Sequence, residues 1–557
     1  MKRILIAFSL VLLLSSSFQM PASAQNTAVI PFGEDYAFDQ RGFIWDFSSI
    51  EHYAFERTRP YFEGGGSLQN GWFVGKIKAT TSGENRVFLL GMTIPGTNPT
   101  QNEGGYHPID TRYYRYLSVR VCIDAPSTQS FGLLGFWHVD GAMTPWGAAG
   151  MTVRGGCGLY TLDLTKRTDG ATDWTAQPMQ GIALKLTHAS GVRVEYDFAR
   201  LSPTPSPGPV TLSWAPAAGT ATLFFDEVPA GSRRTKIADN VDLANGAYTW
   251  TPPHLAPGRY YLFAGTNNVG SFVVNDPPAA TLLNPTFTSG PDYATTVVGN
   301  PWDMNSATDI LQTHNVTGLK FVNGIASAYS EAGSDDPELI FNGPQLYPID
   351  PNRFYYFTYR MRDPLPQDIG AGSVARIFWS DASSPYFTAA TTKDIVTYEG
   401  WKTVTIDLRE ALLLQGAIPW QAAARDGIRL DPHEFSYPRL FELDDVKLTG
   451  NDRANNTYRI NYLASDSDGG INSLELRYSN SPDGSNSLPI SCATGTPVQP
   501  PAGLSMQIYL PLILRGDAFC TWNTTQIPNG DYYIVLIARD TYDQTIRVSE
   551  TPVEIRH

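Results

Sequence analysis

Two stretches of the chain combine flat aromatic side chains with polar groups a few residues apart. The residues of interest are Trp137, His138 and Trp146 in the first stretch and Trp379, Asp381 and Tyr386 in the second. Aromatic rings present flat surfaces for the C–H faces of a sugar, and carboxylate or imidazole groups can form hydrogen bonds with its hydroxyls. These residues are therefore candidates for a shallow carbohydrate-binding face.

The same aromatic residues could instead fill a hydrophobic core, because large aromatic side chains are highly buried on average. For His138 we expect a surface or loop position rather than a ligand contact. The exposure of Trp137 and Trp379 decides between a binding platform and a core.

Motifs that carry catalysis are absent from the sequence. The eight His residues form no zinc-protease pair, and there is no serine elbow, phosphate-binding glycine loop or dinucleotide fingerprint. Pairs of carboxylates are uninformative because the chain contains 54 Asp and Glu residues. We expect no catalytic residues, and a polysaccharide lyase or glycoside hydrolase is the enzymatic alternative.

The four cysteines fall into two local pairs, Cys122 with Cys157 and Cys492 with Cys520. In an exported protein such pairs are expected to form disulfides, each stabilising the fold by about 3–4 kcal/mol if unstrained. Four buried thiols are the alternative. Zinc is disfavoured because no His lies at ligand spacing to either pair.

The N-terminus is typical of a secretory signal peptide. Lys2 and Arg3 precede an apolar run, and Ala22-Ser-Ala24 forms a small-residue cleavage site, so we expect residues 1–24 to be removed. The full chain has a net charge of −14, and the mature chain −16, because residues 1–24 contain two bases and no acid. We therefore expect a secreted or cell-surface protein that binds no nucleic acid and inserts into no membrane.

One pattern of residues occurs twice along the chain, which predicts a duplicated domain. The first copy contains Tyr36, Trp45-Asp46, Pro108-Ile-Asp110, Asp163, Trp174 and Asp197. The second copy repeats them, in the same order, as Tyr293, Trp302-Asp303, Pro348-Ile-Asp350, Asp407, Trp420 and Asp444. Short alternating runs between Gly, Pro, Asn and Asp indicate an all-β protein, and Leu117, Val119 and Val121 share one face of such a strand.

The predicted organisation is four β-sandwiches in a row after the signal peptide. The ranges are 27–201 and 277–450 for the two long modules, 210–275 and 451–557 for the two small ones, and 202–209 for a Pro-rich linker. The last module contains an insertion, 490–520, with an apolar segment at 506–514. That segment either docks on a neighbouring subunit or envelope component, or packs internally.

Each long module closes on a strand of similar pattern, Tyr196-Asp-Phe-Ala-Arg-Leu201 and Leu443-Asp-Asp-Val-Lys-Leu448. With this closing strand the modules resemble jelly-roll carbohydrate-binding modules and galactose-binding-like domains. The small modules resemble bacterial immunoglobulin-like or fibronectin-type domains, on the segments 246–250, 257–261 and 528–533.

The resemblance to jelly-roll modules implies a structural calcium ion near the closing strand. The candidate ligands are Asp46, Asp197, Asp303 and Asp444. Strand parity places Asp197 and Asp444 inward, where a carboxylate needs a cation or several N–H donors. Calcium takes six to eight oxygens, so a carboxylate that caps a turn is the alternative.

These observations favour an exported, non-catalytic protein that binds glycans or cell-envelope polymers through its duplicated jelly rolls. The first alternative is a structural surface or appendage component that self-assembles, and the second is the polysaccharide-degrading enzyme. Fold likeness alone does not decide between them, because one fold hosts many functions.

Overall fold

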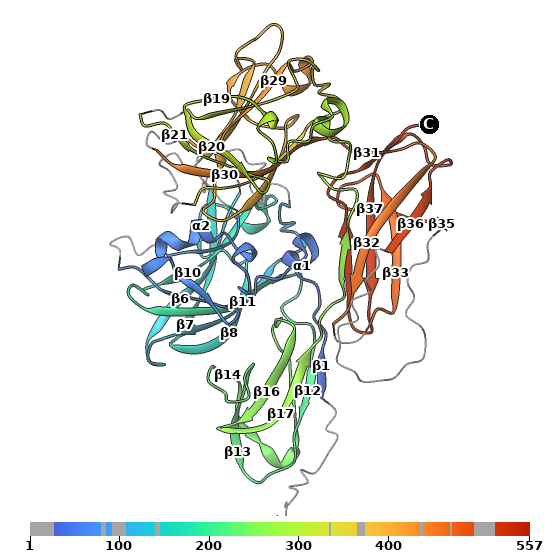
Figure 1. The fold of residues 1–557 in the computed structure, drawn as a ribbon. Coiled ribbons are helices and arrows are strands. Elements are labelled where there is room, and N and C mark those ends of the chain that lie inside the picture. The colour runs from blue at the N-terminus through green and yellow to red at the C-terminus, as the bar shows by residue number, and fades with distance from the viewer. Residues whose placement is uncertain are drawn as a thin grey trace, which may run out of the picture.

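The computed structural model describes residues 27–79, 85–91, 107–139, 145–333, 336–364, 374–434, 438–467, 470–494 and 518–557. The predicted signal peptide and the apolar segment 506–514 lie outside these ranges. Strands dominate the described residues, arranged in several sandwiches (Figure 1). The helices α1 (Tyr36–Arg41) and α2 (Phe55–Thr58) are short. Within the described ranges no helix has the length and apolarity needed to cross a membrane.

Long module 1 consists of two five-stranded sheets. Its sheet 1, which contains the closing strand, has the order β2 (Ser67–Gln69), β3 (Trp72–Lys76), β11 (Arg193–Ser202), β5 (Tyr116–Ile123), β8 (Gly156–Asp163). Its sheet 2 has the order β4 (Val87–Leu90), β10 (Gly181–Thr187), β6 (Ser130–His138), β7 (Trp146–Arg154), β9 (Asp169–Gly170). Leu117, Val119 and Val121 point into the core between the sheets, as their alternation predicts.

Long module 2 repeats this order strand for strand. Its sheet 1 is β20 (Val316–Val322), β21 (Ile325–Ser330), β30 (Leu440–Thr449), β23 (Tyr356–Arg362), β27 (Lys402–Asp407). Its sheet 2 is β19 (Ile310–His314), β22 (Glu338–Phe341), β29 (Gly427–Asp431), β24 (Val374–Ser380), β25 (Ala390–Thr392), β28 (Leu413–Gly416), with β26 (Ile395–Val396) paired to β24. β25 and β26 both pair with β24 where the single strand β7 pairs with β6, and β19, at the edge, has no counterpart in the described part of long module 1.

The repeated tryptophans perform the same structural task in both long modules. The indole N–H of Trp174 donates to the backbone oxygen of Tyr114 at 2.8 Å, and that of Trp420 donates to Phe354 at 2.8 Å. Trp45 pairs with Ala199 of the closing strand, as Trp302 pairs with Val446. The duplication inferred from the sequence is therefore a duplication of one sandwich.

The small modules begin earlier in the chain than the sequence suggested. Small module 1 contains β1 (Ala28–Ile30), which pairs in parallel with β17 (Asn267–Val274), so each end of long module 1 leads into the same sandwich. Small module 2 likewise contains β18 (Ala279–Leu282), which pairs with β32 (Thr457–Ser465). The boundaries expected at 27 and 277 therefore move to the ends of β1 and β18, because each long module is inserted into a small one.

The remaining strands complete the two small modules. In small module 1, β17 continues to β16 (Gly258–Ala264), β13 (Thr220–Asp226) and β14 (Thr235–Asp242), while β12 (Val210–Ser213) pairs with β15 (Ala247–Trp250). In small module 2, β32 continues to β36 (Ala518–Asn523) and β35 (Cys492–Thr494). The second sheet of that module is β31 (Asp452–Ala454), β39 (Val553–Ile555), β37 (Gly530–Arg539), β33 (Ser473–Ser479), β34 (Leu488–Pro489), with β38 (Gln544–Val548) paired to β37.

The C-terminal small module packs back against the N-terminal half of the chain (Figure 1). Asp543, between β37 and β38, accepts hydrogen bonds from the backbone N–H groups of Phe32 and Gly33, both at 2.9 Å. The same carboxylate accepts the side-chain amide of Asn275 at 2.7 Å. The modules are thus fastened together by contacts between residues far apart in sequence.

Both predicted disulfides are present. Cys122 of β5 lies directly opposite Cys157 of β8, and the bond closes a loop of 35 residues. The bond between Cys492 and Cys520 joins β35 to β36 over a separation of 28 residues.

Candidate functional site

The structure places Trp137 and Trp379 in the core, so the expectation that they form a binding platform is wrong. Both side chains are 0% exposed. The Trp137 indole donates to the backbone oxygen of Thr172 at 3.1 Å, and the Trp379 indole donates to Ile418 at 3.2 Å. Strand alternation explains the error, because it turns the residues next to each tryptophan to the outer face.

His138 is also buried, with 0% exposure, rather than at the surface as expected. It lies opposite Gly181 in the β6–β10 pair. A β-carbon at Gly181 would lie 1.8 Å from the imidazole ring, so the glycine leaves the space that the ring occupies. This histidine packs within the module and presents no edge to solvent.

The outward face of sheet 2 in long module 2 combines aromatic and charged side chains. Phe378 of β24 stands opposite Arg429 of β29, and the guanidinium lies 4.0 Å from the centroid of the phenyl ring. On either side of this pair, the register brings the exposed side chains of Gln312 and Gln415 to the same face. The face therefore offers hydrogen-bonding groups around a central aromatic and guanidinium pair.

Arg429 is held by three carboxylates. Its Nε and Nη2 atoms bind the two oxygens of Asp431 at 2.6 and 2.5 Å, Nη2 also binds Asp336 at 2.5 Å, and Nη1 binds Glu338 at 2.7 Å. Burial raises the pKa of Asp431 well above its ordinary value, and burial also raises the pKa of Glu338. Three carboxyl groups therefore surround one guanidinium at this part of the face.

A second arginine of the same face is neutralised in the same way. Arg376 of β24 lies beside Asp431 in the strand register. Its guanidinium binds Asp394 at 2.7 Å and Glu434 at 2.5 Å. These four residues extend the charged surface along β24.

Tyr386 projects from the loop between β24 and β25 with 89% of its side chain exposed. Both Tyr386 and its neighbour Phe387 have positive φ angles, 58° and 60°, which bulky residues rarely adopt. Phe387 packs toward Arg429, with the guanidinium 6.0 Å from its ring centroid. The loop therefore presents Tyr386 to solvent, while its neighbour Phe387 lies near Arg429.

The sequence candidate Asp381 positions this loop rather than facing a ligand. It is 2% exposed and accepts hydrogen bonds from the hydroxyl of Ser383 at 2.6 Å and from the backbone N–H groups of Ser383 and Ser384 at 2.9 Å. Its other oxygen binds the guanidinium of Arg425 at 2.7 Å. These bonds hold the pKa of Asp381 below its ordinary value, and the hydrogen bond from the Ser383 hydroxyl has the largest effect.

Long module 1 has a related but different face. Phe136, the counterpart of Phe378, stacks on Trp146 with ring centroids 5.0 Å apart, and Trp146 is partly exposed. The guanidinium of Arg86 lies 4.2 Å from the centroid of Phe136. An arginine thus covers the equivalent phenylalanine in both long modules, although Arg429 belongs to β29 and Arg86 precedes β4.

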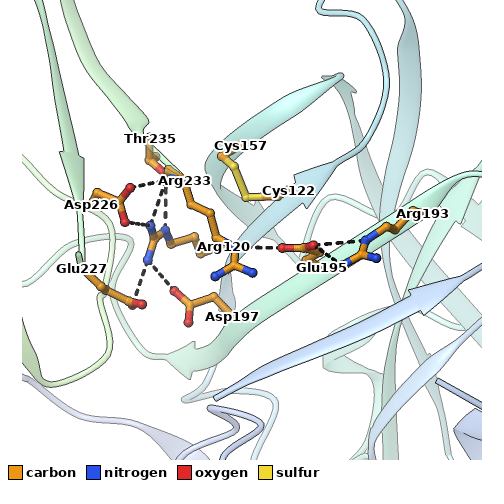
Figure 2. Close-up of a disulfide and its surroundings, with 10 residues drawn as sticks. All are labelled: Arg120, Cys122, Cys157, Arg193, Glu195, Asp197, Asp226, Glu227, Arg233 and Thr235. Carbon is orange, nitrogen blue, oxygen red and sulfur yellow. Dashed lines mark hydrogen bonds and ion pairs between the residues drawn. A yellow bond between two sulfur atoms is a disulfide. The ribbon is translucent and has the colours of Figure 1, made fainter. Parts of the chain in front are cut away.

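The proposed calcium ligands Asp197 and Asp444 bind arginines instead. Asp197 accepts from Arg120 at 2.6 Å, and Asp444 binds Arg360 (Figure 2 shows the first pair). A β-bulge in each closing strand places one extra residue opposite the arginine. The bulge changes the predicted parity, because Tyr196 and Ala199 both pack into the core of long module 1 while Phe198 packs into the core of small module 1.

The other two proposed ligands have local partners. Asp46 accepts hydrogen bonds from the hydroxyl of Ser48 at 2.7 Å and contacts His52 at 2.9 Å, and Asp303 accepts from the backbone of Asn305 at 3.1 Å. Across the described ranges, no group of three or more His, Cys, Asp or Glu residues could hold a metal ion. The turn interpretation therefore applies to Asp46 and Asp303.

Comparisons with solved structures list carbohydrate-binding modules and glycan-degrading enzymes among the matches, all at low similarity. No protein-family model matches, and no curated protein matches. A mutant of a family 29 carbohydrate binding module shares 9% identity with a TM-score of 0.17, covering 31% of this chain and 92% of that one. A structure described as CBM4 shares 18% identity with a TM-score of 0.17, covering 24% and 91%. An agarase shares 11% identity with a TM-score of 0.22, and the match spans 27% of this chain and 25% of that one.

Proposed function

We propose that this protein is exported and binds glycans through the outward face of sheet 2 in its long modules, without a catalytic step. In long module 2 the binding surface is centred on Tyr386 and the Phe378–Arg429 pair. The two disulfides and the apolar N-terminal segment of the sequence support export.

The observation that carries the proposal is the exposure of Tyr386. A tyrosine that is 89% exposed gains almost nothing from burial, yet its backbone adopts a positive φ angle at some cost in free energy. The buried Asp381–Arg425 pair anchors the loop that holds it there. Aromatic side chains held rigidly at a surface favour contacts with a flat ligand, because little conformational entropy is lost on binding.

The outward face of sheet 2, to which the loop of Tyr386 connects, suits a hydroxylated ligand. The side chains of Gln312 and Gln415 are exposed on the same face, and the carboxylates around Arg429 offer hydrogen-bond acceptors. Sugar hydroxyls donate to such carboxylates, while the phenol ring contacts the less polar surface of the sugar. Long module 1 offers Trp146 in place of Tyr386, so the two faces are expected to differ in affinity.

The test is retention of the purified protein on a panel of polysaccharides by affinity electrophoresis. Tyr386→Ala should weaken retention at least several-fold without changing the melting temperature. The matched control is Tyr329→Ala, which removes a tyrosine that is 50% exposed on sheet 1 of the same module and should leave retention unchanged. Equal retention of wild type and Tyr386→Ala, or equal losses in the two variants, would contradict the proposal.

A further inference from the structure

The charges of sheet 2 in long module 2 select among glycans. We infer that this face binds neutral glycans and rejects polymers that carry carboxylate or sulfate groups. The inference rests on the proposed function and specifies its ligand class. It follows from the way in which the two arginines of the face are already occupied.

Most of the N–H donors of Arg429 are occupied by carboxylates of this chain. Each of its three nitrogens binds a carboxylate of this chain, at distances of 2.5 to 2.7 Å. Its side chain is 8% exposed, whereas that of Asp336 is 48% exposed. A ligand therefore meets the carboxylate of Asp336 before it meets the guanidinium.

Arg376 is occupied in the same manner by Asp394 and Glu434. The side chains of this trio are 23%, 27% and 15% exposed, so the acids are as accessible as the base. Together the two clusters place five carboxylates around two guanidinium groups. Asp431 is buried and its pKa is raised well above the ordinary value, so without it the formal surplus is two negative charges on the surface beside Phe378.

An anionic sugar would meet this surplus, and both guanidinium groups already bind carboxylates of this chain. Like charges brought together at an interface disfavour the wrong partner, and the effect weakens as salt screens it. A neutral glycan instead donates its hydroxyl protons to the carboxylates, which act only as acceptors when ionised. The same face can therefore attract hydroxyls and repel carboxylates.

The experiment compares each neutral polysaccharide retained by the protein with its carboxymethylated or sulfated derivative, at low and high salt. We expect the derivative to bind roughly tenfold more weakly at low salt, and the difference to shrink as ionic strength rises. Asp336→Asn removes one exposed charge while Asp431 and Glu338 still hold Arg429. This variant should reduce the discrimination several-fold, because the anionic derivative is then retained more strongly.

The control is Asp445→Asn, which makes the same charge change on sheet 1, where Asp445 is 41% exposed and pairs with Lys447. It should leave the discrimination close to that of the wild type. The inference is overturned if anionic derivatives are retained as strongly as neutral polymers and this retention depends on Tyr386. That result would leave the proposal of glycan binding intact. Retention of no polymer at all overturns the proposed function, and with it the inference.

Discussion

Arg120 of β5 lies 2.6 Å from Asp197 of β11, and the ion pair occupies a bulge that long module 2 repeats with Arg360 and Asp444. The surroundings of the two pairs differ. Small module 1 covers the first pair, so that Arg120 is fully buried and also binds Glu227 at 2.8 Å (Figure 2). The Arg360 side chain is 43% exposed.

This difference predicts unequal effects on stability. Arg120→Ala leaves Asp197 and its acidic neighbours buried without their cation, and should lower the stability of the module by about 3–5 kcal/mol. Arg360→Ala should cost about 0–1 kcal/mol, because water solvates the remaining carboxylate. Thermal unfolding of the two variants under the same conditions measures the difference. Equal shifts in melting temperature would show that the cover by small module 1 contributes nothing to the pair.

A titration near neutral pH is expected from Asp39. Burial, followed by the charge of Asp35, raises the pKa of Asp39 to about 7. Asp39 therefore binds its proton more tightly in the folded state than in the unfolded chain. The stabilisation that this proton gives the fold is complete below the ordinary pKa of a carboxyl group and is lost as the pH rises through 7. Asp39→Asn should remove this pH dependence, with the wild type losing on the order of 2 kcal/mol relative to the variant between pH 5 and 8. Parallel curves for the two proteins across that range would contradict the assignment.

Asp543 is expected to fasten the C-terminal module to the rest of the chain. Asp543→Ala removes the acceptors for the backbone of Phe32 and Gly33 and for the side chain of Asn275. The radius of gyration from small-angle X-ray scattering should then increase. Asp531→Ala, in the same module but 54% exposed, is the control and should not change it. An unchanged radius of gyration in both variants would show that other contacts hold the C-terminal module against the rest of the chain.

Both disulfides should survive in the exported protein. Under denaturing but non-reducing conditions, a thiol-reactive maleimide should add no mass, because all four cysteines are bonded. After reduction it should add four equivalents. Replacing Cys122 and Cys157 by Val should lower stability by about 3 kcal/mol, since the bond closes a loop of 35 residues. Any labelling before reduction would contradict the pairing.

The sequence predicts the duplication and the sandwich class because both depend on repeated local patterns. Trp45 and Trp302, for example, pair with the closing strands in the same way. The sequence does not predict that each long module is inserted into a small one. β1 and β18 are only three and four residues long, and their partners lie more than 170 residues away in sequence.

The candidate site was predicted only in part. Tyr386 is exposed as a binding residue must be, whereas Trp379, seven residues earlier, points into the core. Arg429 and Asp431 were not singled out, although their i, i+2 spacing in a strand places both on one face. The bulge at Asp197 could not be anticipated, because strand parity assumes an unbroken ladder.

The most direct test of the account is a crystal structure of the protein with an oligosaccharide of a retained neutral polysaccharide. We predict sugar density against the ring of Tyr386, extending toward Phe378 and Arg429 on the outward face of sheet 2. Density confined to another surface, such as sheet 1 beside Trp401, would contradict the account.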